Sequence, residues 1–169
     1  MKPSRTVLIV EDEANMRRVL SALLERDGFR TLQASDGGAA LELLARESVD
    51  AILTDLRMPR MNGLELLEAV RLAHPEIPVV MLTAHGTVGS AVEALKQGAF
   101  DYQAKPYDPQ RLLLTVQRAA EQHARRHLGE EPRQPAEHDE LLDRQTAQRD
   151  REVGTERAQQ SPADHRRAG

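Results

Sequence analysis

Two spacings of apolar residues alternate along the first part of the chain. Short runs of mostly aliphatic residues, typical of buried strands, are each followed by a longer segment whose apolar residues lie three and four positions apart, as on one face of a helix. Strands are predicted at residues 6–10, 31–34, 51–54 and 77–83 and around Tyr102. Helices are predicted at residues 15–27, 37–44, 64–73 and 88–97 and from Pro109 onward.

Individual residues mark the faces and ends of these helices. The buried face of the first helix is expected to comprise Met16, Val19, Leu20, Leu23 and Leu24. Asp36 and Asp108 are expected to cap the second and the last helix, with Pro109 at the first helical position of the latter. The pair Asn62-Gly63 is expected to form a turn after the third strand.

Five repeats of a strand followed by a helix predict a parallel sheet with helices on both faces. Parallel neighbours need crossover connections, and these are right-handed. Residues 77–82 are apolar at every position except Pro78, which fits a strand covered on both sides. In open sheets of this kind the functional crevice lies beyond the carboxyl ends of the strands.

The composition narrows the class of protein. The 169 residues are 40% hydrophobic and 30% charged, with a formal net charge of -4 and no cysteine. These values are typical of a soluble globular domain, and they argue against a basic nucleic-acid binder and against disulfides or thiolate metal sites. The first apolar run meets acids after Val10, and no stretch is long enough to cross a membrane, so a cytoplasmic location without membrane contact is expected.

The sequence changes character near its end. Residues 1–126 are predicted to form the single folded domain and residues 127–169 a polar, disordered tail, because large aliphatic residues there are too sparse to offset the entropy cost of ordering. A helix induced by a partner around residues 137–151 is the alternative for this segment. His123 and His127 lie one helical turn apart and could hold zinc, but the sequence indicates no further ligand.

Polar residues stand at the edge where the predicted strand ends converge. They are Glu11 and Asp12 after the first strand, Asp55 after the third, Thr83 at the end of the fourth and Lys105 after the fifth. Each alone is compatible with an ordinary loop or cap, so only their joint placement is informative. Three carboxylates repel one another. At a separation of ~5 Å and an effective dielectric constant of ~20, the repulsion costs about 3 kcal/mol for each pair. A donor set of oxygens alone indicates Mg2+, and the arrangement predicts phosphoryl transfer onto a carboxylate.

Four stretches, "LIVEDEANMRRVL", "TDLRMPRMNG", "MLTAHG" and "GAFDYQAKPYD", resemble the receiver domain of response regulators in two-component signalling, with matches from about residue 7 to residue 124. The resemblance implies a flavodoxin-like α/β fold, a doubly wound sheet of five parallel strands in the order 2-1-3-4-5 with five helices. It also implies that Asp55 is the phosphoacceptor. The Mg2+ site would consist of Glu11, Asp12, Asp55 and the backbone carbonyl of Arg57. Thr83 would be the switch hydroxyl, Tyr102 the switch aromatic and Lys105 the phosphate contact. The bond between Lys105 and Pro106 is typically cis in this family.

The same resemblance implies what the domain does. Asp55 would accept a phosphoryl group from a sensor histidine kinase or phosphotransfer protein. Apart from this self-phosphorylation and a slow autodephosphorylation, the chain would not be an enzyme. Thr83 would be drawn toward the new phosphoryl oxygens, and Tyr102 would rotate into the vacated space. The face formed by the fourth helix, the fifth strand and the fifth helix would then change its contacts with a downstream protein or with a second copy of the chain.

Among receivers, the stretch "TAHGTVGSAVEALKQGAFDY" most resembles those attached to sigma-54-dependent transcription activators. The chain has no G-x-x-x-x-G-K-[ST] phosphate loop, so it is expected to be either a stand-alone receiver or a fragment of a longer regulator, without direct nucleic-acid contact.

Three alternative functions compete with this interpretation. A haloacid dehalogenase-type phosphatase would need a second aspartate where the chain has Arg57. A flavodoxin-like cofactor binder would need hydroxyls and glycine in the first loop, where Glu11, Asp12 and Glu13 would repel phosphate. A protein-interaction scaffold that is never phosphorylated stays open, because a complete site does not prove a cognate kinase.

Gln103 is one departure from the family pattern, since receivers usually carry an aliphatic residue there. An unpaired buried amide at this position would cost about 1 to 3 kcal/mol.

Overall fold

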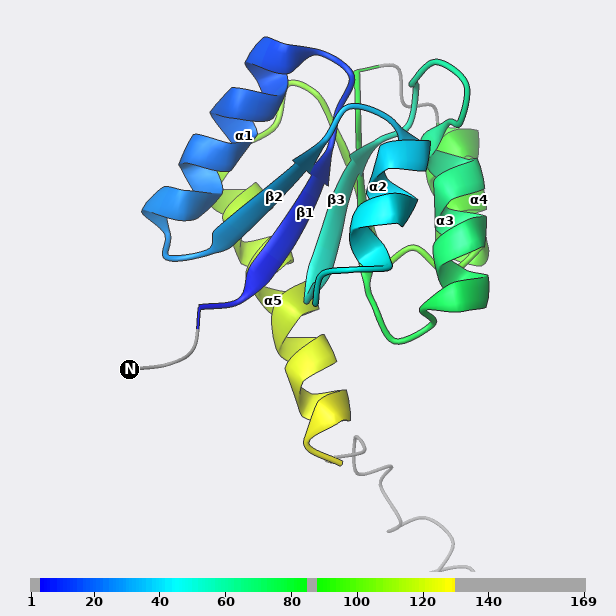
Figure 1. Ribbon diagram of the computed structural model, residues 1–169. Helices are drawn as coiled ribbons and strands as arrows, with labels where there is room; N and C mark the ends of the chain where they lie inside the picture. Colours follow the sequence, from blue (N-terminus) through cyan, green and yellow to red (C-terminus); the bar gives the residue numbers. More distant parts are fainter. Residues whose placement is uncertain (1–3, 85–87, 130–169) are drawn as a thin grey trace, which may run out of the picture. The chain divides into compact units, whose positions relative to one another are not determined.

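Five parallel strands form one sheet in the order β2-β1-β3-β4-β5 (Figure 1). The computed structural model describes residues 4–84 and 88–129. The strands are β1 (Thr6–Val10), β2 (Arg30–Ala34), β3 (Ala51–Asp55), β4 (Val79–Thr83) and β5 (Asp101–Ala104). The helices are α1 (Ala14–Arg26), α2 (Gly37–Leu44), α3 (Gly63–Ala73), α4 (Val88–Lys96) and α5 (Pro109–His127). The predicted doubly wound, flavodoxin-like sheet and its strand order are confirmed.

Helices cover both faces of the sheet. Helices α1 and α5 lie on one face, and α2, α3 and α4 lie on the other (Figure 1). Successive residues of β1 point to opposite faces, so Val7 and Ile9 pack under α1 and α5 while Leu8 and Val10 pack on the other side. All five residues of β1 are buried, as expected for a central parallel strand.

The pairing register aligns the carboxyl ends of the strands. It places Val10 opposite Thr54, Asp55 opposite Leu82, and Thr83 opposite Ala104. The residues that end or directly follow β1, β3, β4 and β5 therefore meet at one edge of the sheet. This is the edge where the sequence predicts the site.

Side-chain caps fix the starts of three helices. Asp36 accepts a hydrogen bond from the backbone N–H of Ala39 at 2.8 Å, and Asp108 accepts one from Gln110 at 2.9 Å. Both predicted caps are confirmed, as is the position of Pro109 at the start of α5. Asn62 also caps a helix by accepting from Glu65 at 2.8 Å, so Asn62-Gly63 begins α3 and is not a separate turn.

Two local predictions are wrong. Val19 was expected on the buried face of α1 but is 55% exposed, because the apolar stripe that meets the sheet is narrower and centres on Leu20 and Leu24. β4 begins at Val79 and not at residue 77, because Ile77 instead closes a turn by donating its backbone N–H to the carbonyl of His74 at 3.1 Å.

Gln103 is buried but not unpaired. Its side-chain Nε2 donates to the hydroxyl of Thr115 on α5 at 2.6 Å. The Thr115 hydroxyl in turn lies 3.0 Å from the carbonyl of Arg111, to which it donates. The cost expected for an orphaned amide therefore does not arise, and the substitution ties β5 to α5 by a polar contact.

Helix α5 extends to His127, past the domain boundary expected at residue 126. The tail was expected to comprise residues 127–169, and its part from residue 130 onward, with the alternative helix at residues 137–151, lies outside the described residues. Within residues 4–84 and 88–129, no helix combines the length and the apolar character needed to span a bilayer.

Candidate functional site

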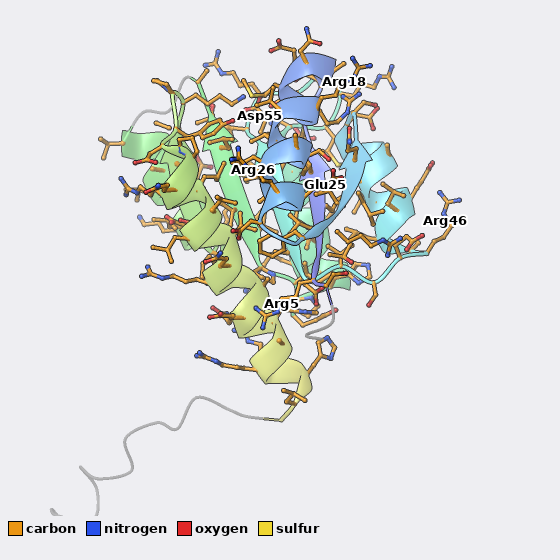
Figure 2. The ribbon with its side chains drawn as sticks, turned by 90° about the vertical axis from the view of Figure 1, so that its left-hand side faces the viewer. Arg5, Arg18, Glu25, Arg26, Arg46 and Asp55 are labelled. Atoms are coloured by element: carbon orange, nitrogen blue, oxygen red, sulfur yellow. The ribbon has the colours of Figure 1, made fainter. Side chains whose placement is uncertain are left out.

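Three carboxylates converge at the carboxyl end of the sheet. Glu11 and Asp12 directly follow β1 and Asp55 is the last residue of β3, and one oxygen from each lies within 4.8 Å of the others. Figure 2 shows Asp55 at the opposite end of the sheet from Arg5, which precedes β1. Glu11 is buried, Asp55 is half-buried and Asp12 is exposed, so the cluster opens to solvent on the side of Asp12.

Lys105 supplies the positive charge beside these acids. Its Nζ lies 3.1 Å from Oε2 of Glu11 and 3.5 Å from Oδ2 of Asp55. The backbone N–H of Lys105 donates to the carbonyl of Thr83 at 2.7 Å, and the bond from Lys105 to Pro106 is cis, as the resemblance implies. The closer contact is with Glu11, which leaves the ammonium only a long hydrogen bond to Asp55.

Burial and charge shift the pKa values of this pair. Burial raises the pKa of the Glu11 carboxyl, although the hydrogen bond from Lys105 opposes that rise. For Lys105, burial alone would lower the pKa, but the hydrogen bond to Glu11 and the charge of Asp55 outweigh it and raise the pKa. The ammonium therefore stays charged at neutral pH and holds the two acids together.

Backbone contacts fix the turn that carries Glu11 and Asp12. The guanidinium of Arg17 donates to the Glu11 carbonyl at 2.7 Å, and the N–H of Glu13 donates to Oε1 of Glu11 at 3.2 Å. Arg17 was not predicted to take part in the site, because nothing in a single sequence distinguishes it from its neighbour Arg18. Only the path of the chain between β1 and α1 reveals its role as a positioning residue.

The other predicted site residues lie around this cluster. Thr83 ends β4 and is 1% exposed, next to the edge that carries Lys105. Arg57 lies in the loop after β3, two residues beyond Asp55, with an exposed side chain. Tyr102 packs against the core on the side of α3 and α4, and its buried phenol oxygen makes no hydrogen bond to the part of the chain that the structure describes.

The two tyrosines give a pH prediction. Burial raises the pKa of both phenols above 10.0, and the charge of Asp55 adds to the rise at Tyr102, whereas Lys105 opposes it at Tyr107. The unfolded chain ionises first, so the stability that the neutral phenols contribute is present below pH 10 and is lost as the pH rises through their folded-state pKa values. Tyrosinate absorbance should show both phenols ionising at a higher pH than in the unfolded chain.

The contribution of Asp55 to the pKa of Tyr102 can be tested in a Tyr107→Phe background, where Tyr102 is the only tyrosine left. In that background Asp55→Asn should lower the pKa of Tyr102, and an unchanged pKa would contradict the prediction.

The donor set at the cluster fits a hard divalent cation. Among the described residues, the only group of three or more metal-ligating side chains is Glu11, Asp12 and Asp55, and all of its donors are oxygens. Mg2+ prefers oxygen ligands and is commonly held by one or two carboxylates with water completing the shell. Asp12 lies on the exposed side of the cluster, where solvent water could complete such a shell.

Comparison with known proteins identifies the family. A model of the response regulator receiver domain matches residues 7–117. The chain belongs to this family. Receiver domains of response regulators are signalling domains, and they generally use Mg2+.

Relatives of this receiver include regulatory protein AtoC of Escherichia coli (strain K12), 47% identical over 113 residues, and the DNA-binding transcriptional regulator NtrC of the same organism, 41% identical over 113 residues. Each alignment covers 67% of this chain and 24% of the relative, so the chain spans about a quarter of their length. These relatives agree with the predicted resemblance to receivers of sigma-54-dependent activators.

A solved structure of the receiver domain of NtrX from Brucella abortus superposes with a TM-score of 0.65 and 35% identity, covering 68% of this chain and 98% of that one. The part of the chain that matches is therefore a receiver without the remainder of the longer regulators. The name of NtrC gives DNA binding to that regulator as a whole, of which this chain covers about a quarter.

Proposed function

We propose that this receiver is a Mg2+-dependent phosphoacceptor switch that takes a phosphoryl group from a histidine kinase onto Asp55. The observation that carries the proposal is the convergence of Glu11, Asp12 and Asp55 within 4.8 Å, with Lys105 paired to two of the three. Such an arrangement has little use in packing, because like charges at this separation repel one another. It suits a site that receives a cation and a phosphoryl group.

Asp55 acts as the nucleophile. One carboxylate oxygen forms a bond to phosphorus while the bond from phosphorus to the donor breaks, and the electron pair of that bond leaves with the imidazole of the kinase phosphohistidine. With acetyl phosphate as donor, acetate leaves instead. Glu11, Asp12, Asp55 and the carbonyl of Arg57 would hold Mg2+, which, when bound, supplies positive charge at the phosphoryl oxygens.

Lys105 and Thr83 bind the transferred group. The Lys105 ammonium already lies 3.5 Å from Asp55 Oδ2, and it is placed to contact a phosphoryl oxygen once that oxygen is attached. Thr83 ends the neighbouring strand, one residue beyond Leu82, which is the register partner of Asp55, and its hydroxyl can donate a second hydrogen bond. Each charge-assisted hydrogen bond of this kind is worth roughly 1.5 to 3 kcal/mol.

The signal leaves through Tyr102 and the face formed by α4, β5 and α5. A few such hydrogen bonds approach the ~5.5 kcal/mol needed to reverse a two-state equilibrium. The phenol oxygen of Tyr102 is buried and has no hydrogen-bond partner within residues 4–84 and 88–129, and this supports a role in the switch, because a small displacement could supply it with one. The output would be a contact with a downstream protein, or within a longer regulator of the AtoC and NtrC type.

The test is incubation of the full chain with acetyl phosphate. A single phosphoryl adduct is expected by intact mass in the presence of Mg2+, and fragmentation should place it at Asp55. Chelation of the metal with EDTA is expected to reduce the adduct to background. No labelling at all would favour the unphosphorylated scaffold, and equal labelling with and without Mg2+ would reject the metal dependence of the proposed reaction.

A further inference from the structure

A histidine pair lies on the last turns of α5. His123 is 5% exposed and His127 is exposed, and their Nε2 atoms are 3.0 Å apart. The ring centroids lie 4.4 Å apart with an interplanar angle of 77°. Two imidazoles facing end to end across this contact would have more distant centroids. At least one Nε2 direction is therefore inclined to the line that joins the nitrogens, and rotation of the exposed His127 ring could aim both nitrogens at one shared ion.

Asp50 fixes the buried ring of this pair. Its Oδ1 lies 3.1 Å from Nδ1 of His123, and its Oδ2 accepts the backbone N–H of Thr6 at 2.7 Å. A carboxylate only accepts hydrogen bonds, so Nδ1 of His123 carries a proton, and in the neutral ring Nε2 then presents its lone pair. A carboxylate that holds the far nitrogen of a histidine in this way is the usual outer partner of a metal-bound imidazole.

We propose that His123 and His127 form a bidentate site for a borderline divalent transition-metal ion, of which Zn2+ is the representative. The free nitrogens of both rings would bind the ion, and the proton now on Nε2 of His127 would move to Nδ1 of that exposed ring through solvent. Among the described residues no third ligating side chain joins the pair, so water would complete the coordination. Asp50 directly precedes β3 and Asp55 ends it, so the two metal sites occupy opposite ends of one strand.

The donor types keep the two sites chemically distinct. Imidazole nitrogens favour Cu2+, Ni2+ and Zn2+, whereas Mg2+ prefers the oxygens of the acidic cluster. The carboxyl end of α5 and the carboxylate of Asp50 attract a cation, while Arg125 and Arg126 in the same turn oppose it. Excess Mg2+ should therefore occupy the acidic cluster without displacing Zn2+ from the histidines.

The experiment titrates the full chain with Zn2+ in the presence of excess Mg2+. Long-range proton–nitrogen correlation NMR should show Zn2+ shifting the Nε2 signals of His123 and His127 together, while Nδ1 of His123 keeps its proton. Calorimetry should show His127→Ala losing at least tenfold in affinity. Asp50→Asn keeps both imidazoles and should lose roughly 10–100-fold, the usual effect of removing an outer partner.

His74→Ala is the matched control, because His74 lies at the end of α3 beside Glu76, 3.9 Å away, and takes no part in the pair. Its Zn2+ affinity should equal that of the unaltered chain. His127 is exposed, so its replacement leaves the core intact. Unshifted Nε2 signals, or unchanged Zn2+ affinity in His127→Ala, would overturn the proposal, and neither result depends on phosphorylation of Asp55.

Discussion

The Asp55→Asn variant is expected to acquire no phosphoryl group from acetyl phosphate and Mg2+, under conditions that label the unaltered chain. The amide oxygen carries no negative charge and is a poor nucleophile. Among the carboxylates that the structure describes, no other both contacts Lys105 and is open to solvent. Asp12 is exposed but makes no hydrogen bond to Lys105, and Glu11 is buried. Intact mass spectrometry over a time course measures the outcome directly.

Two controls make the Asp55→Asn result interpretable. Glu42→Gln removes an exposed carboxylate from α2, away from the site, and should be labelled normally. Urea unfolding in EDTA should find Asp55→Asn at least as stable as the unaltered chain. The variant removes one of three clustered carboxylates, while Lys105 keeps its shorter contact with Glu11. Equal labelling of Asp55→Asn would place the acceptor elsewhere and reject the proposed function.

Replacement of Lys105 by methionine should change catalysis and metal binding in opposite directions. The rate of phosphorylation should fall by about 100-fold, the usual effect of removing one group that stabilises developing charge. Mg2+ should bind more tightly by roughly tenfold, because the ammonium that competes with the cation for Glu11 and Asp55 is gone. The adduct time course gives the rate, and calorimetry gives the Mg2+ affinity.

The opposite signs separate a local electrostatic role from general damage. A misfolded Lys105→Met protein would lose both phosphorylation and Mg2+ binding. Lys96→Met removes an exposed ammonium from the last turn of α4 and should alter neither quantity. A Lys105→Met variant phosphorylated at the normal rate would show that the lysine pairs with Glu11 for stability alone.

The sequence predicted most of the fold because its signals are local. Strand β1, the caps at Asp36 and Asp108, and the order of the elements follow from periodicity and from the hydrogen-bonding habits of single residues. The exposed position of Val19 was not predictable in this way, because the width of a buried helix stripe depends on what packs against it. The partner of Gln103 was hidden for the same reason, since Thr115 lies in another element.

The sequence predicted which residues meet at the site, but not which of them form hydrogen bonds with one another. Strand ends in a parallel sheet converge whatever their side chains, so Glu11, Asp12, Asp55 and Lys105 could be placed together from the sequence. The pairing depends on differences of less than an ångström, which the sequence does not contain. Examples are the shorter contact of Lys105 with Glu11 than with Asp55, and the hydrogen bond from Arg17 to the Glu11 carbonyl. The Asp50 contact of His123 was equally invisible, because the two residues are far apart in the chain.

Gly63 limits how the acceptor strand can respond to modification. Its N–H donates to the carbonyl of Leu56 at 2.8 Å, and a Cβ there would meet the Asp55 carbonyl and come within 2.9 Å of the Leu56 Cα. Helix α3 thus begins in direct contact with the backbone of the acceptor residue, and a side chain at position 63 would force the two apart. We therefore expect α3 to keep its place when Asp55 is modified, and the response to develop on the flank of the sheet that carries Thr83 and Tyr102.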